Sequence, residues 1–350
     1  MKKRTNIFNI CAVSAAVFSA VIFGGSVYSE AVPAASIAEE NPRIYLIPCG
    51  TPFGIKMLTD GVVVTDFGCV NGKVSQRSPA EKAGVRKGDI VTTVNGNEVT
   101  DSVSLSDFVQ LSAEKCELEI IRDDKILNIT CVPERSEKDG ALKLGMWTKD
   151  SCAGIGTMTY YNPATEEFGG LGHAVSELSS GVTLPLLSGE ITDVTITNVI
   201  KSSSGSPGEL CGAFIPEHET GKILKNTEYG VFGRAEIPPV NSEPLEMAYR
   251  SEVKKGEAYI YSTITGNTPE KYEIEILSID SNNSGSLKNM TIKITDERLL
   301  SETGGIVQGM SGSPIIQNDR LIGAVTHVLV NDSTVGYGIF AENMIEACNG

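Results

Sequence analysis

Residues 140–350 alternate between short apolar-rich segments and turns rich in Gly, Pro, Asn and Ser. Within the segments every second position is often apolar, which is the period of a strand with one buried face. The clearest examples are Glu190–Ile200, Glu257–Ile264, Tyr272–Ile279 and Met290–Ile294. Only residues 341–348 have helical spacing. The pattern predicts a β-barrel or β-sandwich of some 200 residues.

The preceding hundred residues follow a different pattern. Short strands are expected at residues 44–47 and 61–67, and again at 87–96, where the last strand runs into an Asn-Gly turn. A short helix is predicted at residues 78–84, capped by a serine and ended by a glycine, and a second helix at 104–111. A hairpin at 116–131 completes this unit, so a small α+β domain precedes the β-rich one.

The motifs S-P-A-E-K-A-G-V-R-K-G-D-I-V and V-N-G lie in this first unit. With their spacing, residues 43–134 resemble a bacterial PDZ domain. The resemblance implies that the loop Thr51–Ile55, with Thr51, Phe53, Gly54 and Ile55, holds a peptide terminus on backbone N–H groups. The alternative is a small domain that only packs against its neighbour.

The N-terminus has the pattern of an export signal. Lys2, Lys3 and Arg4 precede an uncharged, mostly apolar run at residues 7–28. At about 1.5 Å per residue this run could also span a membrane, so residues 1–29 are expected to be a signal peptide or an uncleaved anchor. Residues 30–42 resemble a linker. The remainder is expected to work outside the cytoplasm.

Net charge and cysteine usage narrow the function classes. The formal charge of −15 argues against nucleic-acid binding, which needs a basic face. No C-x-x-C pair or Cys/His cluster is present, so no metal site and no cofactor are expected. Cys116 and Cys131 flank Asp123-Asp124 symmetrically, which predicts that they face each other across a hairpin, either as a disulfide or as two buried thiols.

The strongest catalytic signal is G-G-I-V-Q-G-M-S-G-S-P-I-I, which contains Ser311. Glycines on both sides allow a sharp turn whose amides, here those of Gly309 and Ser311, can face a developing oxyanion beside the hydroxyl. Acyl transfer needs that juxtaposition. The motif therefore predicts a serine nucleophile.

A serine nucleophile needs a base, and the chain has three histidines. His173, in F-G-G-L-G-H, is the preferred candidate because close glycines project one imidazole at a turn. His327, in an apolar strand, is the main alternative, whereas His218 lies in an acidic, polar stretch. A lysine base is disfavoured because Ser311 is not part of an S-x-x-K motif.

A carboxylate is expected to orient the base. Asp296 follows a predicted strand and precedes Ser311 by 15 residues. Spacing alone leaves four alternatives open: Asp193, Asp280, Asp319 and Asp332.

The run I-T-D-E-R-L-L-S-E-T-G-G-I-V-Q-G-M-S-G-S-P-I-I-Q-N, the later L-I-G-A-V-T-H-V-L-V-N-D and the F-G-G-L-G-H motif resemble the SpoIVB peptidase family of endospore-forming bacteria. The resemblance implies a chymotrypsin-like double β-barrel at residues 140–350 and the triad His173, Asp296 and Ser311.

It also implies an exported serine endopeptidase of sporulation, active between the forespore and mother-cell membranes. Its expected partners are a membrane-bound regulator of an intramembrane protease, as substrate, and its own N-terminal region through self-cleavage. The rival interpretation is a catalytically inactive, PDZ-containing scaffold of the cell envelope.

Overall fold

The computed structural model describes residues 43–350 except 72–77, 113, 204, 236–241 and 283–284. The predicted leader and linker therefore lie outside the described residues. Within the described part, no helix has the length and apolar content that crossing a membrane requires.

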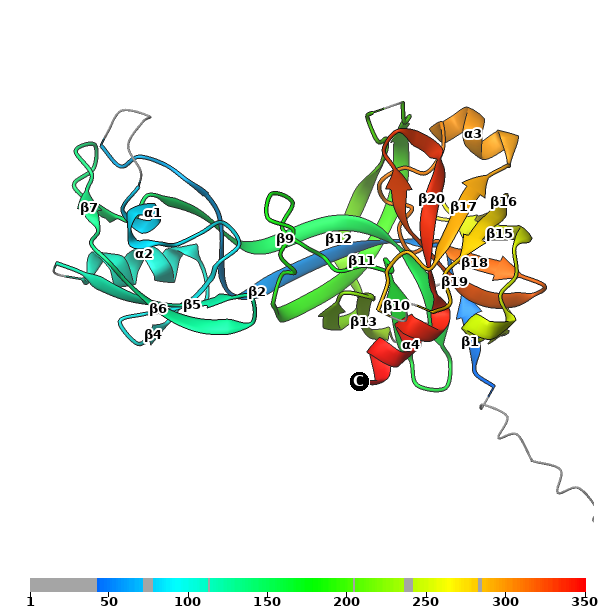
Figure 1. Ribbon diagram of the computed structural model, residues 1–350, viewed down its shortest axis with the longest axis horizontal. Helices are drawn as coiled ribbons and strands as arrows, with labels where there is room; N and C mark the ends of the chain where they lie inside the picture. The colour runs from blue at the N-terminus through cyan, green and yellow to red at the C-terminus, as the bar shows by residue number, and fades with distance from the viewer. Residues whose placement is uncertain (1–42, 72–77, 113, 204, 236–241, 283–284) are drawn as a thin grey trace, which may run out of the picture. The chain divides into compact units, whose positions relative to one another are not determined.

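Two closed barrels of six strands each form the peptidase part (Figure 1). The first barrel is closed by antiparallel pairing, in spatial order, of β2 (Pro52–Phe67), β9 (Met146–Asn162), β10 (Glu167–Gly170), β13 (Gly230–Ala235), β12 (Glu209–Thr227) and β11 (Leu186–Ile200), which returns to β2. Short β1 (Tyr45–Pro48) pairs with β9 beside it.

The second barrel closes in the same way. Its strands in spatial order are β15 (Gly256–Ser262), β16 (Glu270–Ile279), β17 (Met290–Ile294), β20 (Asp332–Phe340), β19 (Arg320–Leu329) and β18 (Pro314–Gln317), which pairs back with β15. Along β16 the side chains of Tyr272, Ile274 and Ile276 are buried while Glu273 and Glu275 are exposed. The period-two pattern in the sequence thus becomes the inner and outer faces of this barrel.

The PDZ-like unit has its own core beneath two capped helices. Its elements are α1 (Pro79–Ala83), β3 (Ile90–Val94), β4 (Asn97–Glu98), α2 (Ser102–Gln110), β5 (Cys116–Arg122), β6 (Lys125–Cys131), β7 (Glu134–Arg135) and β8 (Leu142–Lys143). The Ser78 hydroxyl caps α1 and Gly84 ends it in the left-handed region. Asp101 caps α2 in a reciprocal capping box with Ser104. Cys116 and Cys131 are register partners and both are buried.

The PDZ-like unit is an insertion in the first barrel, and it does not precede it. The half of β2 at residues 52–58 pairs with β9 and β11 of the barrel, whereas Val62 and Val63 of the same strand pair with β3 of the PDZ-like sheet. The chain returns along β9, where Leu58 and Ser151 are register partners. The predicted start of the PDZ-like domain at residue 43 is therefore too early, because β1 pairs with β9 and the first half of β2 is a barrel strand.

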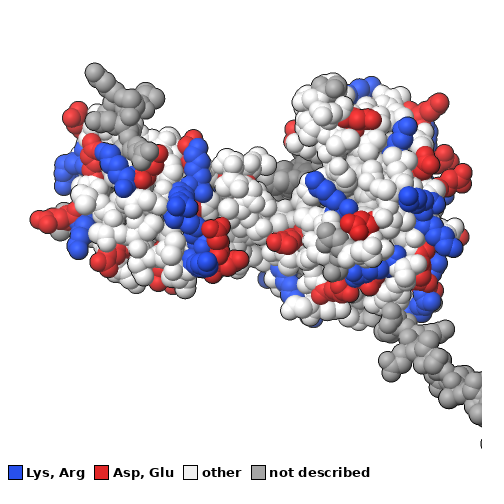
Figure 2. Space-filling model, in the orientation of Figure 1, with Lys and Arg blue, Asp and Glu red and all other residues white. Residues whose placement is uncertain are grey.

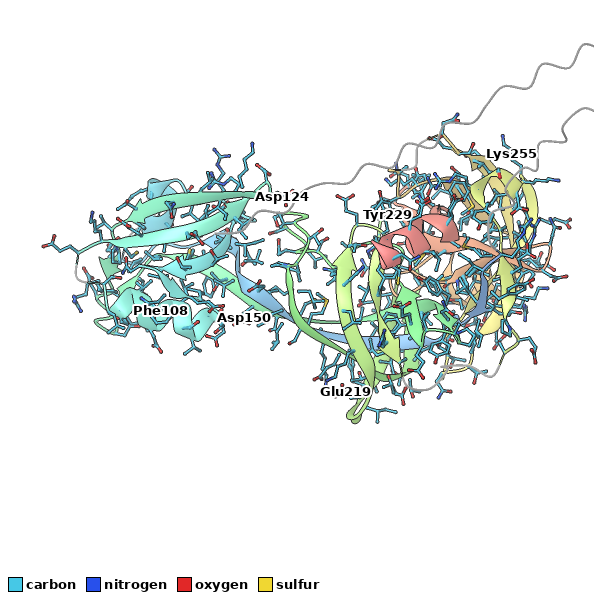
Figure 3. The ribbon with its side chains drawn as sticks, turned by 90° about the horizontal axis from the view of Figure 1, so that it is seen from below. Phe108, Asp124, Asp150, Glu219, Tyr229 and Lys255 are labelled. Carbon is cyan, nitrogen blue, oxygen red and sulfur yellow. The ribbon has the colours of Figure 1, made fainter. Side chains whose placement is uncertain are left out.

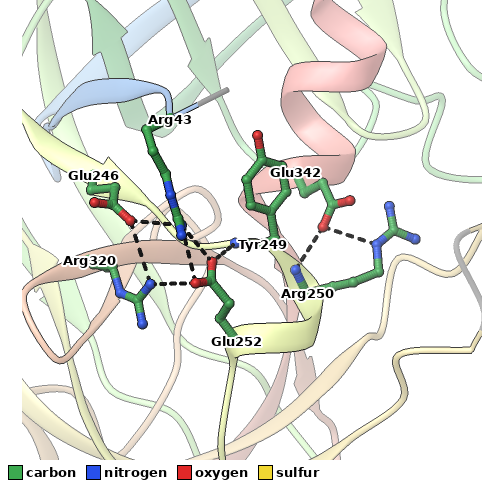
Figure 4. Close-up of polar contacts among 7 residues, drawn as sticks. All are labelled: Arg43, Glu246, Tyr249, Arg250, Glu252, Arg320 and Glu342. Atoms are coloured by element: carbon green, nitrogen blue, oxygen red, sulfur yellow. Dashed lines mark hydrogen bonds and ion pairs between the residues drawn. The ribbon is translucent and has the colours of Figure 1, made fainter. Parts of the chain in front are cut away.

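Ion pairs fix the start of the described chain on the second barrel. Arg43 bonds Glu246 and Glu252 at 2.9 and 3.1 Å, and Arg320 bonds Glu252 at 2.8 Å (Figure 4). Glu246 lies on β14 (Leu245–Met247) and Glu252 in the 3-10 turn Arg250–Glu252. Backbone and side-chain bonds together lower the pKa of Glu252 to about 2. Elsewhere, on the face that Figure 2 draws, acidic and basic side chains are interspersed.

The architecture confirms the predicted fold class. The chain is mainly β, with a small α+β unit of PDZ type and a double β-barrel. Two helices complete the second barrel: α3 (Glu297–Thr303) precedes the Ser311 turn, and α4 (Ala341–Asn349) follows β20.

Candidate active site

Ser311 lies in a tight turn between α3 and β18. Gly309 and Gly312 on either side have φ of +96° and +98°, in the region that glycine adopts without strain. A Cβ on Gly312 would lie 1.9 Å from the carbonyl oxygen of Thr157 on β9. Glycine is required here both for the backbone angle and for close approach to the first barrel.

The carbonyls of this turn are held by neighbouring elements. The Thr157 hydroxyl donates to Gly309 O at 2.6 Å, and the Thr159 hydroxyl donates to Gly312 O at 2.8 Å. The Leu210 N–H donates to Gln308 O at 2.9 Å. Buried backbone groups are nearly always paired, so these bonds fix the orientation of each peptide unit.

Two backbone N–H groups of the turn are unpaired among the described residues. Among the contacts of the described residues, the N–H groups of Gly309 and Ser311 have no hydrogen-bond acceptor, whereas those of Gln308, Met310 and Gly312 each donate to a carbonyl. They are the same two amides that the sequence motif assigned to an oxyanion pocket. An unpaired amide beside a hydroxyl is what a developing oxyanion requires.

The Ser311 hydroxyl itself donates to the carbonyl oxygen of Thr326 at 2.7 Å. Thr326 lies on β19, and its methyl group is 2.9 Å from where a Cβ on Gly172 would stand. Gly172 therefore packs against the residue whose carbonyl oxygen accepts the hydrogen bond of the Ser311 hydroxyl. No hydrogen bond joins Ser311 to His173 in this form of the described chain, so the hydroxyl must rotate before it can meet the imidazole.

His173 follows β10 after a turn in which Leu171 and Gly172 both have positive φ, at +67° and +69°. Its Nδ1 lies 2.8 Å from the carbonyl oxygen of Ala174. A carbonyl can only accept, so Nδ1 carries the proton and Nε2 keeps its lone pair. Burial lowers the pKa of His173, partly offset by the Ala174 bond. A neutral imidazole with a free Nε2 can act as a general base.

His327, the alternative base, is next to His173. The ring centroids are 5.2 Å apart and the planes are tilted by 43°. Burial, followed by the charges of His173 and Lys288, lowers the pKa of His327 to about 4. Its Nδ1 is buried without a hydrogen-bond partner among the described residues. His173 and His327 thus line the same cleft as Ser311, while position 218 lies within β12.

These groups line one cleft of about 880 Å³. Both barrels contribute to its walls, which include Ser311, His173 and His327. Most other side chains that line it are apolar, among them Ile155, Leu171, Ile306, Val307 and Val328. Its acidic side chain is Glu228, in the turn between β12 and β13. An extended apolar peptide fits this chemistry better than a charged one.

Asp296 is not joined to His173 in this structure. Its carboxylate caps α3 by accepting the N–H groups of Arg298 and Leu299, pairs with the Arg298 guanidinium at 2.8 Å, and accepts Glu273 N–H at 3.3 Å. The Arg298 bond contributes most to lowering the pKa of Asp296. Neither Asp296 nor any of the four alternative aspartates (Asp193, Asp280, Asp319, Asp332) lines the cleft.

The segment Thr51–Ile55 is in the wrong place for its predicted peptide-binding role. Phe53 and Ile55 are each 3% exposed in the core of the first barrel, and a Cβ on Gly54 would meet Thr192 and Phe214 at about 2.5 Å. Thr51 accepts the N–H of Met158. This half of β2 pairs with β9 on one side and β11 on the other, so no free edge remains for a peptide strand.

The PDZ-like unit has a groove elsewhere. A cavity of about 400 Å³ lies between α2, through Leu105 and Val109, and the segment Leu142–Thr148. Gln110 and Ser102 fix the two ends of α2 to that segment and its continuation, by bonds to Leu142 and Asp150. Phe108 on α2 and Asp150 on β9 are labelled in Figure 3. The K-L-G-M-W run at residues 143–147 is the sequence signal for this groove, since a glycine flanked by apolar residues follows a hairpin.

A double β-barrel with a serine in a glycine turn, a neutral histidine beside it and two unpaired amides defines a serine peptidase of the chymotrypsin-like class. Residues 140–345, more than half of the chain, match the family described as SpoIVB peptidase S55. The chain belongs to that family. Residues 53–131 match the PDZ domain family.

Individual relatives are more distant. A protein of Clostridium acetobutylicum that is named a putative zinc metalloprotease is 28% identical over 115 residues. The match covers 33% of this chain, and the chain spans about a third of that protein's length. An inactive form of the Rv3671c protease of M. tuberculosis is 14% identical, with 55% of this chain and 81% of that chain covered and a TM-score of 0.30. The PDZ domain of an SdrC-like protein of Listeria monocytogenes is 20% identical, covering 25% and 87%, with a TM-score of 0.22.

Proposed function

We propose that this chain is an exported serine endopeptidase of sporulation that cuts a membrane-bound regulator of an intramembrane protease, and also cuts itself. Ser311 is the nucleophile and His173 the base, with the amides of Gly309 and Ser311 as the oxyanion hole. The observation that carries the proposal is the convergence of these groups from two barrels on one cleft.

The proposed chemistry follows from the tautomer of His173. Because Nδ1–H donates to Ala174 O, Nε2 is free to accept the proton of Ser311 once that hydroxyl leaves Thr326 O. The oxygen then attacks the scissile carbonyl, whose negative charge is stabilised by the two unpaired amides. The tetrahedral intermediate collapses, the C–N bond breaks and His173 gives its proton to the leaving amine; a water activated by the same base then releases the acyl group from Ser311.

The sporulation substrate and the extracytoplasmic location rest on family membership and on the basic, apolar leader of the sequence. The membrane would hold the substrate near an enzyme tethered or released by that leader. The groove between α2 and Leu142–Thr148 would bind an extended segment of the substrate or of the enzyme's own N-terminal region, adding affinity without taking part in the chemistry.

Labelling with a fluorophosphonate tests the nucleophile and the base. We expect the wild-type protein to be labelled at Ser311. The Ser311→Ala and His173→Ala variants should lose labelling, whereas His327→Ala should retain it. If His327→Ala loses labelling while His173→Ala keeps it, the base is assigned to the wrong ring. Labelling of Ser311→Ala at the wild-type rate would remove Ser311 from the mechanism.

The topology decides how the PDZ-like unit can be removed. Deleting residues 43–134 would take two barrel strands with it, whereas joining Leu58 to Ser151 through a two-residue turn follows their native register. We expect that excision variant to keep Ser311 labelling and to lose most cleavage of a folded protein substrate. Unchanged cleavage would leave the groove without a role in substrate capture.

A further inference from the structure

We propose that the enzyme cuts after a small aliphatic residue such as alanine or valine, because Ile306 and Val328 limit the space for the substrate side chain next to Ser311. This inference rests on the proposed peptidase function and names the class of residue on the acyl side of the scissile bond. It is carried by two runs of residues that line the cleft beside Ser311, at 306–309 and at 326–328.

The reaction divides the cleft into an acyl half and an amine half. The acyl group becomes bonded to Ser311, and its carbonyl oxygen faces the N–H groups of Gly309 and Ser311. The amine takes a proton from His173, so it lies towards that ring and the cleft-lining residues that follow it, up to Thr183. The side chain of the acyl residue is therefore received by the two runs on the Ser311 side, which the bond from the Ser311 hydroxyl to Thr326 O holds together at 2.7 Å.

Backbone hydrogen bonds fix the position of the 306–309 run. The Ile306 N–H donates to Ser333 O at 2.7 Å, and the Gln308 N–H donates to Gly208 O at 2.8 Å. A Cβ on Gly305, just before the run, would lie 2.2 Å from Ser333 O, so the chain has no room to move towards β20. The size of the space beside Ser311 is thus set by the side chains that project from a fixed backbone.

Ile306 fills the space that a glycine on β20 leaves. A Cβ on Gly336 would lie 2.4 Å from Ile306 Cδ1 and 2.6 Å from His327 O. Gly336 is the register partner of Val328, on the adjacent strands β20 and β19 (Figure 1). The end of the Ile306 side chain therefore occupies the place where a longer substrate side chain would otherwise reach β20.

Val328 narrows the same place from β19. It is half-buried and packs against the core cluster of the second barrel, which includes Ile306 and Val307. Ile306 and Val307 are each 2% exposed, so neither can turn outward without leaving the core. Valine and isoleucine are also stiff at χ1, and a close-packed interior resists insertion of even one extra methylene. A large substrate side chain is excluded.

The chemistry of the two runs disfavours a charged residue as well. Their side chains are apolar or neutral: Ile306, Val307 and Gln308 in one run, and Thr326, His327 and Val328 in the other. Burial lowers the pKa of His327 to about 4, so its ring is uncharged at neutral pH. A lysine or aspartate side chain placed there would lose water without gaining an opposite charge.

The test uses peptidyl diphenyl phosphonates that react with the serine nucleophile and differ only in the residue on the acyl side: Ala, Val, Leu, Phe or Lys. The readout is the second-order rate constant for labelling Ser311, with circular dichroism to verify folding. Two variants enlarge the space: Ile306→Val, which removes the methyl group next to Gly336, and Val328→Ala. The matched control is Ile276→Val, which removes the same methyl group from the same barrel core but does not line the cleft.

We expect the wild-type protein to react with the Ala and Val probes at least about tenfold faster than with the Leu, Phe and Lys probes, since one methylene in an apolar pocket changes selectivity by about tenfold or more. In Ile306→Val and in Val328→Ala the ratio of the Leu rate to the Ala rate should rise by about tenfold. In Ile276→Val that ratio should stay within about twofold of wild type, because the site is independent of the cleft.

Three results would overturn the inference. The first is a wild-type protein that reacts fastest with the Phe or Lys probe. The second is a wild-type Leu-to-Ala ratio in both folded cleft variants. The third is an equal rise in the Ile276→Val control, because the selectivity would then come from looser packing of the whole barrel. Failure of the proposed function looks different: the wild-type protein would then not be labelled even by a small alkyl fluorophosphonate, which has no acyl-side residue.

Discussion

The Thr157 hydroxyl offers the sharpest test of how the first barrel holds the Ser311 turn of the second. Thr157→Val keeps the shape of the side chain and removes the donor to Gly309 O, a bond of 2.6 Å. Thr157 is 2% exposed, so water cannot easily replace the lost hydroxyl. The backbone bond from Thr157 N to Ser311 O, at 3.1 Å, remains.

The expected magnitude follows from the group left unpaired. A buried acceptor that loses its donor costs about 1–3 kcal/mol. If the turn escapes that cost by moving the Gly309 carbonyl, the competent arrangement becomes less populated by about 5- to 150-fold, at 1.36 kcal/mol per factor of ten. If the turn stays in place, the same free energy is lost from global stability instead.

Two measurements separate these outcomes. Fluorophosphonate labelling reports the population of the competent turn, and urea unfolding reports the free energy of unfolding. The control is Thr197→Val, which removes an exposed hydroxyl that donates to Cys211 O at 3.3 Å outside the site. We expect the control to change neither quantity by more than about 0.5 kcal/mol.

A Thr157→Val variant with wild-type labelling and wild-type stability would refute the reasoning. The bond to Gly309 would then contribute nothing to the turn. Slower labelling in both valine variants to the same extent would also count against it, because the effect would not come from the Gly309 carbonyl.

The remaining predictions concern stability, pH and redox state. Asp89 is 1% exposed and pairs with Arg122 at 2.6 Å. Asp89→Ala leaves Arg122 without that partner, so the free energy of unfolding of the PDZ-like unit, measured in urea, should fall by about 3 kcal/mol. A loss below about 1 kcal/mol would contradict this. Burial lowers the pKa of His327 from 6.5 to about 4, so between these pH values the unfolded chain binds more protons than the folded chain. Thermal stability should therefore fall as the pH falls from 6.5 to 4, and His327→Gln should reduce the dependence of the melting temperature on pH. The same pH dependence in the variant and in wild type would refute it. Cys116 and Cys131, which are opposite each other in the hairpin, should form a disulfide in chain purified from an oxidising compartment, read by mass spectrometry as a loss of two hydrogens; two free thiols after oxidation would leave them as buried packing residues.

The turns that carry Ser311 and His173 could be predicted from the sequence because glycine spacing encodes tight turns directly. Gly309, Gly312 and Gly172 all have positive φ, a backbone conformation that glycine adopts without strain. The alternation along residues 270–279 likewise translated directly into barrel faces. Local sequence patterns were therefore sufficient to predict the turns and the buried strand faces.

Asp296 shows that one motif can predict two different roles. The run T-D-E-R-L-L has the pattern of a helix N-terminus, an acidic cap before apolar residues, and the structure uses it as one. Its place in the sequence before Ser311 suggested a catalytic carboxylate, but spacing along the chain carries no information on which barrel wall a side chain joins.

The path of β2 could not be predicted from its residues. The segment G-I-K-M-L-T-D-G-V-V-V is compatible with a strand in either unit, and only long-range pairing with Ile191 and Gly154 on one half, and with Val91 on the other, assigns the two halves. The unit to which each half of such a strand belongs depends on partners far away in the sequence. The predicted Thr51–Ile55 loop was wrong on that account.

The insertion of the PDZ-like unit has a consequence for how the enzyme is made. During synthesis, residues 52–58 emerge long before β9, so the first barrel cannot close until the inserted unit has been translated. An unfolded insert would have to close a long loop, at an entropic cost that grows with its length. A PDZ-like unit that folds first places Leu58 and Ser151 side by side, so the nascent barrel meets a preformed hairpin stem. The PDZ-like unit therefore also sets when the first barrel can close.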